Sequence, residues 1–314
     1  MRAYHSGMAR EGENLLVVLG ATASGKTRLG ARLAHALGGE VVSADSRQVY
    51  RGLKLGAGKD LDEYVVDGVP VPYHLIDIVD LDAEFSVFAY QRCFYKVFES
   101  IRCRGCLSVV VGGTGLYLEA VLAPYRMVEA PPNPELRAEL DQLPQEALVA
   151  RLRTLKPRLH NTTDLTDRDR LVRAVEIATY SQTHEPKPAP DMRPLVLGTH
   201  WERSALRRRI HGRLQQRLDA GMIDEVAGLH ARGVSWERLE RLGLEYRFIA
   251  QYLEGKMRDK TGLFEMLFTA ICQFAKRQET WFRRMERNGT VIHWVDEADF
   301  DAAWRIVREH LTVT

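Results

Sequence analysis

The sequence predicts an α/β fold, in which a doubly wound parallel sheet is interrupted by a helical insertion domain. Up to Leu122, short apolar runs that end near glycine alternate with helical patterns, which is typical of a parallel sheet covered by helices. Between Glu135 and about Gln182 only helical patterns occur, and proline-rich breaks flank that stretch. We therefore expect a core domain of residues 1–124 and 194–314, with a helical C-terminal part, and an insertion of residues 125–193.

The strands are predicted from short runs of apolar residues, because a strand buried on both faces of a sheet is apolar throughout. The helices are predicted from apolar residues at helical spacing, such as Leu29, Leu33 and Leu37, and Gly38 provides a stop signal for the first helix. Strands are expected at 15–19, 41–43, 74–78, 107–111, 195–197 and 291–295. Helices of the core domain are expected at 27–37, 85–101, 115–122, 204–220, 223–232 and 261–286.

Composition is that of an ordinary globular protein, with 45% hydrophobic and 27% charged residues among 314. No apolar run approaches the roughly 18 residues of a membrane helix, and residues 1–14 lack the apolar core of a signal peptide, so a cytoplasmic location is expected. Cys103 and Cys106 have C-x-x-C spacing, but no second pair follows. Basic residues crowd 203–217 and 276–287, as solvated helix faces or as phosphate-binding stripes.

A phosphate-binding loop is predicted where the first strand meets the first helix, because residues 20–27 match the pattern G-x-x-x-x-G-K-S/T. Its glycines let several backbone N–H groups point at one anion, and the start of the helix adds positive potential. Lys26 adds a full charge, and the Thr27 hydroxyl can hold Mg²⁺. The segment comprises Gly20, Ala21, Thr22, Ala23, Ser24, Gly25, Lys26 and Thr27. The predicted sheet is thus a P-loop-containing one.

The residues after the later strands favour group transfer over nucleotide hydrolysis. A hydrolysing P-loop protein needs an aspartate at the end of a later strand to hold the metal and its water. The best candidate strand, 107–111, is followed by Gly112, Gly113 and Thr114 instead. Asp77 and Asp80 lie near another strand, but in no clear pattern of that kind.

Asp45 is the candidate catalytic carboxylate, because it ends the second strand and is expected next to the P-loop. Parallel sheets bind ligands at this edge. The loop 43–48 also contains hydroxyls, a guanidinium and an amide. Helix capping and turn chemistry would explain such a loop as well, but the neighbouring P-loop favours a role facing the substrate.

Six segments together resemble the family of tRNA dimethylallyltransferases, also called tRNA isopentenyltransferases. They are GATASGKT at 20–27, SADSRQVYRG at 43–52, HLIDI at 74–78, VGGTGLYL at 111–118, RAVEI at 173–177 and AKRQETWFR at 275–283. They span nearly the whole chain in the family's order. The resemblance implies transfer of a prenyl group from dimethylallyl diphosphate, held by the P-loop, to the exocyclic N6 of the adenosine 3′-adjacent to the anticodon of tRNA.

The resemblance also implies roles for individual residues. Asp45 matches the family's general base, Thr114 a position near the target nucleotide and Arg213 an arginine that contacts the diphosphate, while Mg²⁺ would bind at Thr27. The insertion would clasp the anticodon stem-loop, and the substrate would cover so much surface that a monomer is expected. Contacts to tRNA are expected from Asp45, Ser46, Arg47, Gln48, Arg137, Asp169, Arg170, Arg173, Lys276, Arg277, Gln278, Trp281 and Arg283.

Departures from the family pattern and three other functions remain open at this point. Proline is common in the family where Ala21 stands, Gln where Asp169 stands, and Gly where Glu245 stands. The alternatives are prenyl transfer to a free adenine nucleotide, phosphoryl transfer by a nucleoside or small-molecule kinase, and a nucleic-acid-binding module without catalysis.

Overall fold

The chain divides into two compact units in the computed structural model. The first comprises Met1–Ala123 and Pro190–Thr314, and the second comprises Pro124–Ala189. The structure describes residues 12–122, 128, 130–156, 165–186 and 188–311. The insertion predicted at 125–193 extends beyond the second unit, because residues 190–193 lead directly into a strand of the core.

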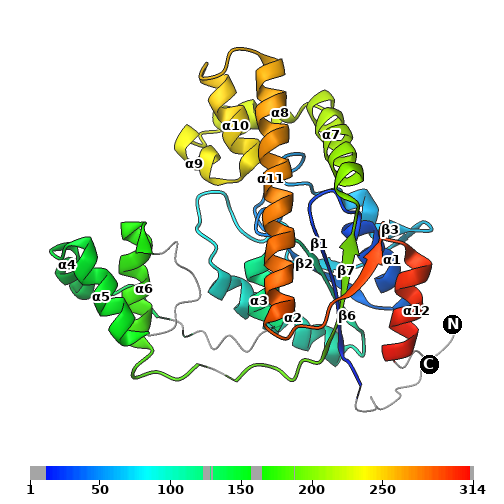
Figure 1. Cartoon of the computed structure of the whole chain (residues 1–314), viewed down its shortest axis with the longest axis horizontal. Helices are drawn as coiled ribbons and strands as arrows, with labels where there is room; N and C mark the ends of the chain where they lie inside the picture. Colours follow the sequence, from blue (N-terminus) through cyan, green and yellow to red (C-terminus); the bar gives the residue numbers. More distant parts are fainter. Residues whose placement is uncertain (1–11, 123–127, 129, 157–164, 187, 312–314) are drawn as a thin grey trace. The chain divides into compact units, whose positions relative to one another are not determined.

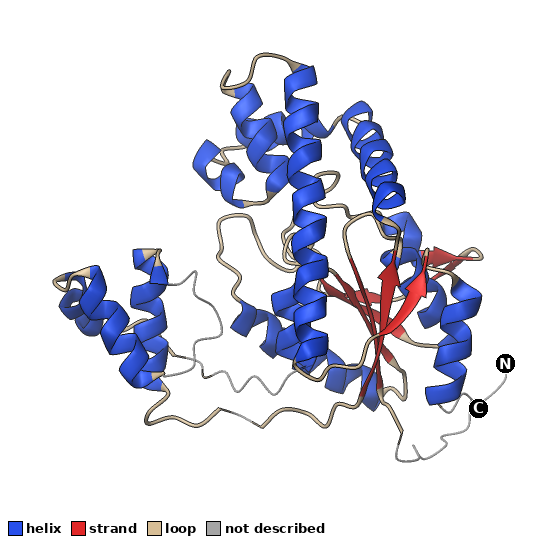
Figure 2. Cartoon of the chain, viewed as in Figure 1, coloured by secondary structure: helices blue, strands red, loops and turns tan. Residues whose placement is uncertain are grey.

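The first unit is built on a parallel sheet, as the sequence predicts (Figures 1 and 2). Its strands follow the order β5-β2-β6-β1-β7-β8, and each pair of neighbours is parallel. They are β1 (Leu15–Gly20), β2 (Glu40–Ala44), β5 (Tyr73–His74), β6 (Ser108–Gly112), β7 (Pro194–His200) and β8 (His293–Asp296). A 3₁₀ helix η1 (Leu61–Tyr64) and a separate hairpin of β3 (Val65–Val66) and β4 (Val69–Pro70) lie between β2 and β5 in sequence.

Two sequence-based expectations about this sheet are wrong. The strand predicted at 74–78 stops at His74, because Leu75 (φ 61°) and Asp77 (φ 55°) turn the chain into the left-handed region. The strand that ends before Asp45 is also not next to β1, because β6 lies between them. Asp45 is therefore one strand further from the P-loop than we expected.

Helices cover both faces of the sheet. Leu16 and Val18 face α1 (Lys26–Leu37) and α12 (Phe300–His310), whereas Val17 and Leu19 face α2 (Val87–Cys103) and α3 (Gly115–Leu122). This alternation follows from the two-residue period of a strand. All four side chains are fully buried, so the sheet that presents the P-loop is held rigidly from both sides.

A cluster of helices stands beyond the carboxyl ends of the strands (Figure 1). It contains α7 (Arg203–Asp219), α8 (Met222–Ala231), α9 (Trp236–Arg241), α10 (Leu244–Leu253) and α11 (Lys260–Arg287). Helix α11 joins two cores, because Leu267 and Ile271 pack in the helical cluster while Phe282 and Met285 pack under the sheet. The sequence analysis placed α7, α8 and α11 and missed α9, α10 and α12.

The second unit is a helical bundle with an internal charge network. Its helices α4 (Pro134–Asp141), α5 (Gln145–Leu155) and α6 (Arg168–Tyr180) share a small apolar core. The Glu176 carboxylate, 1% exposed, accepts hydrogen bonds from the Asn133 N–H and from the side chains of Arg137 and Arg173, at 2.8–3.2 Å. Glu176 thus orients Arg137 and Arg173, two of the three arginines of this unit that are expected to touch tRNA.

None of the helices in the described part of the chain is both long and apolar enough to cross a membrane.

Replacing Glu176 with Gln should destabilise the second unit by about 1–3 kcal/mol, between the values for exposed and buried ion pairs. Burial alone would raise the pKa of Glu176, but hydrogen bonds from Arg137, the Asn133 N–H and Arg173 lower it to about 2 from the ordinary 4.5. A carboxyl with a lowered pKa stabilises the folded state above its unfolded pKa and loses that effect as the pH falls. The difference in melting temperature between the wild type and Glu176→Gln should therefore shrink below pH 4.5.

The exposed Glu146 provides the matched control for that experiment, because Glu146→Gln removes the same charge from the same unit. Circular dichroism melting curves at several pH values give the comparison, and hydrogen exchange assigns the change to the second unit. A difference that stays constant down to pH 3 would contradict this account.

Candidate active site

The P-loop forms as the sequence predicts, between β1 and α1. Positive φ angles at Ala23 (63°) and Gly25 (83°) turn the chain, and Gly25 caps α1 without any side-chain hydrogen bond. The first-turn amides of α1 therefore lack a side-chain cap, and an anion can take that place. Arg209 and Trp201 fix the loop from outside, since their side chains donate to the carbonyl oxygens of Ala23 and Ser24.

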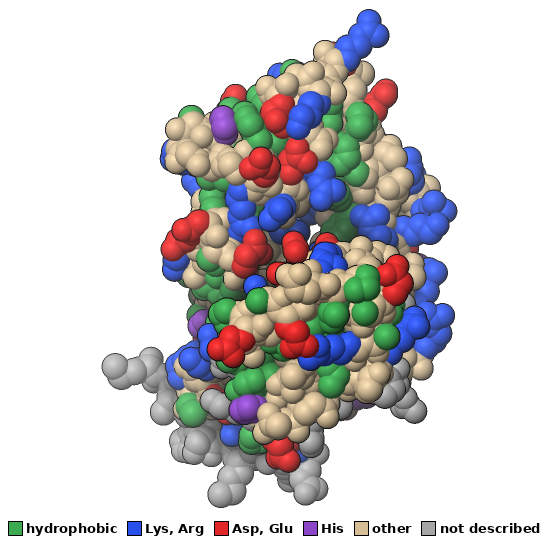
Figure 3. Space-filling model, turned by 90° about the vertical axis from the view of Figure 1, so that its left-hand side faces the viewer, with side chains coloured by type: hydrophobic (Ala, Val, Ile, Leu, Met, Phe, Trp, Pro, Cys, Tyr) green, Lys and Arg blue, Asp and Glu red, His purple; other side chains and the backbone are tan. Residues whose placement is uncertain are grey.

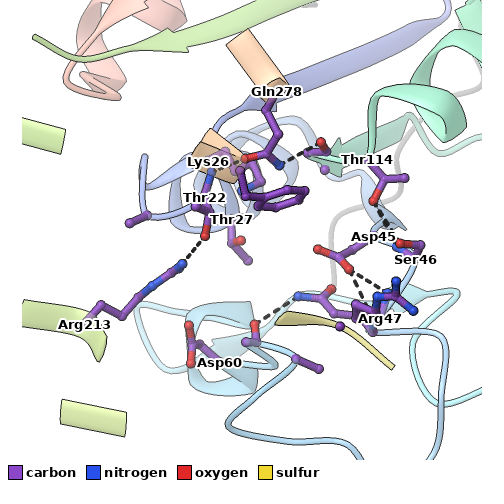
Figure 4. A pocket seen from close by; sticks show the side chains of 18 of the residues that line it. Thr22, Lys26, Thr27, Asp45, Ser46, Arg47, Asp60, Thr114, Arg213 and Gln278 are labelled. Carbon is purple, nitrogen blue, oxygen red and sulfur yellow. Dashed lines mark hydrogen bonds between the residues drawn. The ribbon is translucent and has the colours of Figure 1, made fainter. Parts of the chain in front are cut away.

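A cavity of about 680 Å³ opens above the P-loop. Its walls come from the ends of β2 and β6, the loop after β2, and helices α7, α10 and α11 (Figure 4). The predicted site residues that line it are Thr22, Ala23, Gly25, Lys26, Thr27, Asp45, Ser46, Arg47, Gln48, Thr114, Arg213, Arg277, Gln278 and Trp281. One cavity thus collects residues from both ends of the sequence.

Two half-buried cations mark the anion-binding part of the cavity. Burial, together with the charge of Arg213, lowers the pKa of Lys26 to about 8. Burial, together with the charge of Arg217, lowers the pKa of Arg213 to about 10. The Arg213 guanidinium donates to the Thr22 hydroxyl and so points at the P-loop. Cations held this close repel one another, which favours a strongly charged anion between them.

Gln278 lines the cavity, and its side chain also braces the P-loop. Its Oε1 accepts from the Thr22 N–H and its Nε2 donates to the Gly113 carbonyl, both at 2.8 Å. The residue is 7% exposed and lies on the apolar stripe of α11, between the two cores. The signal in the sequence was a Gln at a position where the helical period demands an apolar residue.

Asp45 reaches the cavity from the opposite side to Arg213 (Figure 4). Its Oδ1 accepts from the N–H groups of Arg47 (2.8 Å) and Gln48 (3.4 Å), so turn chemistry is one part of its role. Its Oδ2 makes no hydrogen bond to the described residues and is free to act on a ligand. The Thr114 hydroxyl accepts from the Ser46 N–H at 3.1 Å and ties this loop to the end of β6.

Glycines at the end of β6 leave room between Asp45 and the P-loop. A Cβ on Gly112 would come within 2.2 Å of the Ala44 carbonyl oxygen, and one on Gly113 within 2.9 Å of that of Gly20. The absence of side chains there lets Asp45 and Lys26 share one cavity although β6 separates their strands. Gly112 and Gly113 stand where a hydrolysing P-loop protein has its metal-binding aspartate. This site therefore requires glycine at both positions.

Several predicted residues lie outside the cavity or serve the fold. Gly20 and Ala21 contribute through their backbone, and the Ser24 hydroxyl accepts from Thr199 at 2.7 Å. Gln48 is 9% exposed, and its amide contacts the Ser43 hydroxyl and the Gly58 carbonyl, so it too has an internal role. Arg137, Asp169, Arg170 and Arg173 belong to the second unit, and Lys276 and Arg283 lie exposed on α11.

The aromatic wall of the cavity is formed by Trp281. Its ring packs on Gly115, where a Cβ would come within 2.4 Å of the indole, and Arg284 stacks on it with its guanidinium carbon 4.0 Å from the ring centre. The buried indole N–H has no partner among the described residues.

Lys and Arg side chains gather along one edge of the face shown in Figure 3, whereas the rest of that face carries side chains of both charges.

Sequence reasoning missed five charged residues of the cavity. Arg209 and Arg217 stand one turn of α7 before and after Arg213, and this i, i+4, i+8 spacing was a usable signal. Asp60, Glu63 and Glu245 also line the cavity, and Asp60 forms a salt bridge with Arg217 at 2.8 Å. The loop of Asp60 and Glu63 has no motif that could have revealed it.

The residues present fit Mg²⁺ as a partner of the anion. Among the described residues no group of three or more His, Cys, Asp or Glu side chains could hold a metal by itself. The Thr27 hydroxyl lies in the cavity, however, and Mg²⁺ keeps several waters and binds through few protein oxygens plus substrate phosphates.

Fold and site together define a P-loop transferase, in which an anion cradle and a carboxylate share one cavity and the strand beside the P-loop ends without a metal-binding aspartate. The family model "IPP transferase" matches residues 48–285, and the model "Isopentenyl transferase" matches residues 13–68. The chain belongs to the tRNA dimethylallyltransferase (IPP transferase) family.

Similar proteins cover nearly the whole chain. It is 58% identical to tRNA dimethylallyltransferase 1 of Geotalea uraniireducens over 90% of this chain and 92% of that one, and 55% identical to tRNA dimethylallyltransferase 1 of Syntrophus aciditrophicus over 92% and 96%. The full-length tRNA isopentenylpyrophosphate transferase of Bacillus halodurans superposes with a TM-score of 0.67 at 32% identity, covering 96% and 95% of the two chains. A eukaryotic dimethylallyltransferase acting on tRNA shares the fold, with a TM-score of 0.74 at 21% identity and coverage of 94% and 78%.

Anion binding should weaken as the pH rises through 8. The pKa of Lys26 is lowered to about 8, so its ammonium is charged below that pH and loses its charge above it. Affinity for inorganic diphosphate, measured by calorimetry, should fall about tenfold per pH unit above pH 8. Lys26→Met should bind more weakly and lack the fall that Lys26 causes, and the pH dependence that comes from ionisation of the ligand cancels when the two profiles are compared. A wild-type profile parallel to that of the variant would contradict the assignment.

Replacing Gln278 with Ala should loosen the P-loop, because the Thr22 N–H and the Gly113 carbonyl lose their partner. We expect a loss of about 1–3 kcal/mol in stability, the usual result of leaving buried polar groups unpaired, and weaker diphosphate binding. Gln273→Ala, an exposed position on the same helix, serves as the control. Equal diphosphate affinities for the two variants would show that the brace has no effect on the site.

Proposed function

We propose that the chain transfers a dimethylallyl group from dimethylallyl diphosphate to the exocyclic N6 of the adenosine 3′-adjacent to the anticodon of tRNA, releasing diphosphate. The observation that carries this proposal is the single cavity that holds both the P-loop cations and the free Oδ2 of Asp45. Family membership identifies the donor and the acceptor, and the cavity supplies a place for each.

The donor's diphosphate lies on the P-loop in this proposal. Lys26, the first-turn amides of α1 and Arg213 bind its oxygens, and their charges stabilise the negative charge that builds up as the carbon–oxygen bond breaks. The Thr27 hydroxyl would hold Mg²⁺, which would supply further positive charge to the diphosphate. Because both cations line the cavity before the donor binds, little reorganisation accompanies the reaction.

The acceptor side depends on Asp45. An adenine amine is a poor nucleophile, since its lone pair is delocalised into the ring, so removal of its proton assists the attack. N6 forms a bond to C1 of the prenyl group, the bond from C1 to the diphosphate oxygen breaks, and the proton of N6 passes to the Oδ2 of Asp45. Thr114 holds the loop that carries this carboxylate.

The proposed tRNA contacts come from α11, from the loop that follows β2 and from the second unit. Bases splayed from an RNA loop need aromatic and guanidinium platforms, with phosphates held by Lys and Arg. On α11 we assign this role to Lys276, Arg277, Trp281 and Arg283, and near Asp45 to Ser46 and Arg47. In the second unit we assign it to Arg137, Arg170 and Arg173, with Asp169 beside them. A monomer and a cytoplasmic location stay predictions.

Replacing Asp45 with Asn should lower the rate of prenyl transfer by about 10²–10⁴-fold, the usual contribution of a general base. Binding of the anticodon stem-loop should persist, because the substitution leaves the loop backbone intact. Mass spectrometry of tRNA incubated with dimethylallyl diphosphate and Mg²⁺ measures the gain of one five-carbon unit. Asp67→Asn, in an exposed turn, is the control.

Two outcomes of that experiment would overturn the proposal. Normal transfer by Asp45→Asn would remove Asp45 from the mechanism. Modification of AMP with tRNA left unmodified would identify a free nucleotide as the acceptor.

A further inference from the structure

Glu245 is a carboxylate of the donor cavity that the mechanism does not use. It stands in the first turn of α10, which begins after Gly243, whose φ of 137° lets the chain turn toward the cavity. Its side chain lines the main cavity. A carboxylate in the first turn of a helix is favoured by the helix dipole.

Glu245 also lies beside the arginines of the donor site. A second, water-sized cavity of about 10 Å³ is lined by Arg213, Arg217 and Glu245, and otherwise by apolar side chains. Glu245 forms no salt bridge with the described residues, whereas Arg217 is already paired with Asp60. Burial raises the pKa of Glu245, and the charges of Arg217 and Arg213 oppose that rise.

Arg213 lies between the P-loop and Glu245. Arg213 links the two places, because its guanidinium donates to the Thr22 hydroxyl at the P-loop and its side chain borders the cavity shared with Glu245. A chain of phosphates that started at Lys26 and extended along Arg213 would approach Glu245 and Asp60, which line the same cavity. Each added phosphate brings more negative charge toward carboxylates in a poorly solvated space.

We propose that Glu245 is a specificity-determining residue of the donor site, whose carboxylate competes with phosphates for Arg213 and Arg217 and so disfavours anions longer than a diphosphate. In the empty site Glu245 supplies a counter-charge to the two arginines. With a diphosphate bound, it leaves the P-loop contacts intact and opposes a third phosphate. This inference rests on the proposed function only in taking the donor's diphosphate as the occupant of the P-loop.

The test compares binding of inorganic diphosphate and inorganic triphosphate by calorimetry, in the wild type and in Glu245→Gln. The variant should bind triphosphate about tenfold more tightly and diphosphate at most about threefold more tightly, as expected when one nearby charge is removed. Glu245→Ala should show the same change in selectivity. Glu265→Gln, at an exposed position of α11, should bind both anions as the wild type does.

Three results would overturn the inference: equal gains for both anions, unchanged binding, or weaker binding by folded variants, as judged from their melting curves. Prenyl transfer to tRNA is measured on the same preparations. Absence of transfer in the wild type would count against the proposed function alone, because the two inorganic anions report on Glu245 without any reaction.

Discussion

The repulsion between Lys26 and Arg213 is the constraint on which the site depends. Among the described residues neither cation forms a salt bridge, and both have a pKa lowered chiefly by burial. Holding charges partly away from water is unfavourable, and in the proposed function a bound diphosphate would offset that effect. The empty site therefore contains a repulsion that the proposed donor would relieve.

The fold tolerates this repulsion because each cation is held by an element anchored elsewhere. Lys26 begins α1, which packs on a sheet buried on both faces, and Arg213 lies on α7, whose Ile210 and Leu214 are buried in the helical cluster. Helix α11 ties the two regions together, with one apolar stripe in both cores and Gln278 between them. An amide suits that position, since it satisfies a donor and an acceptor of the backbone without adding charge near the cations.

Local signals explain what the sequence predicted and what it did not. The P-loop, five of the six sheet strands and the long helices follow from short motifs and periodicity. The strand predicted at 74–78 ends at His74 in the structure, because Leu75 adopts a left-handed conformation. The segment of Asp60 and Glu63 carries no motif, and α9, with 6 residues, is too short to show a helical period. Helices α10 and α12 are amphipathic, and their pattern was overlooked. Gln278 and Gln48 are predicted RNA contacts, and a sequence motif does not reveal that both side chains also bond to the backbone.

The position of Asp45 connects the topology to the chemistry. In a hydrolysing P-loop protein the strand beside the P-loop supplies an aspartate, which holds the metal and its water. Here that strand, β6, ends in glycines, and the carboxylate comes from β2, one strand further away. In the proposed function this distance would keep Asp45 apart from the phosphates, and the space that Gly112 and Gly113 leave free would admit the second substrate. A carboxylate placed there can take a proton from an acceptor that enters the cavity between it and the donor, which is what transfer to a base requires.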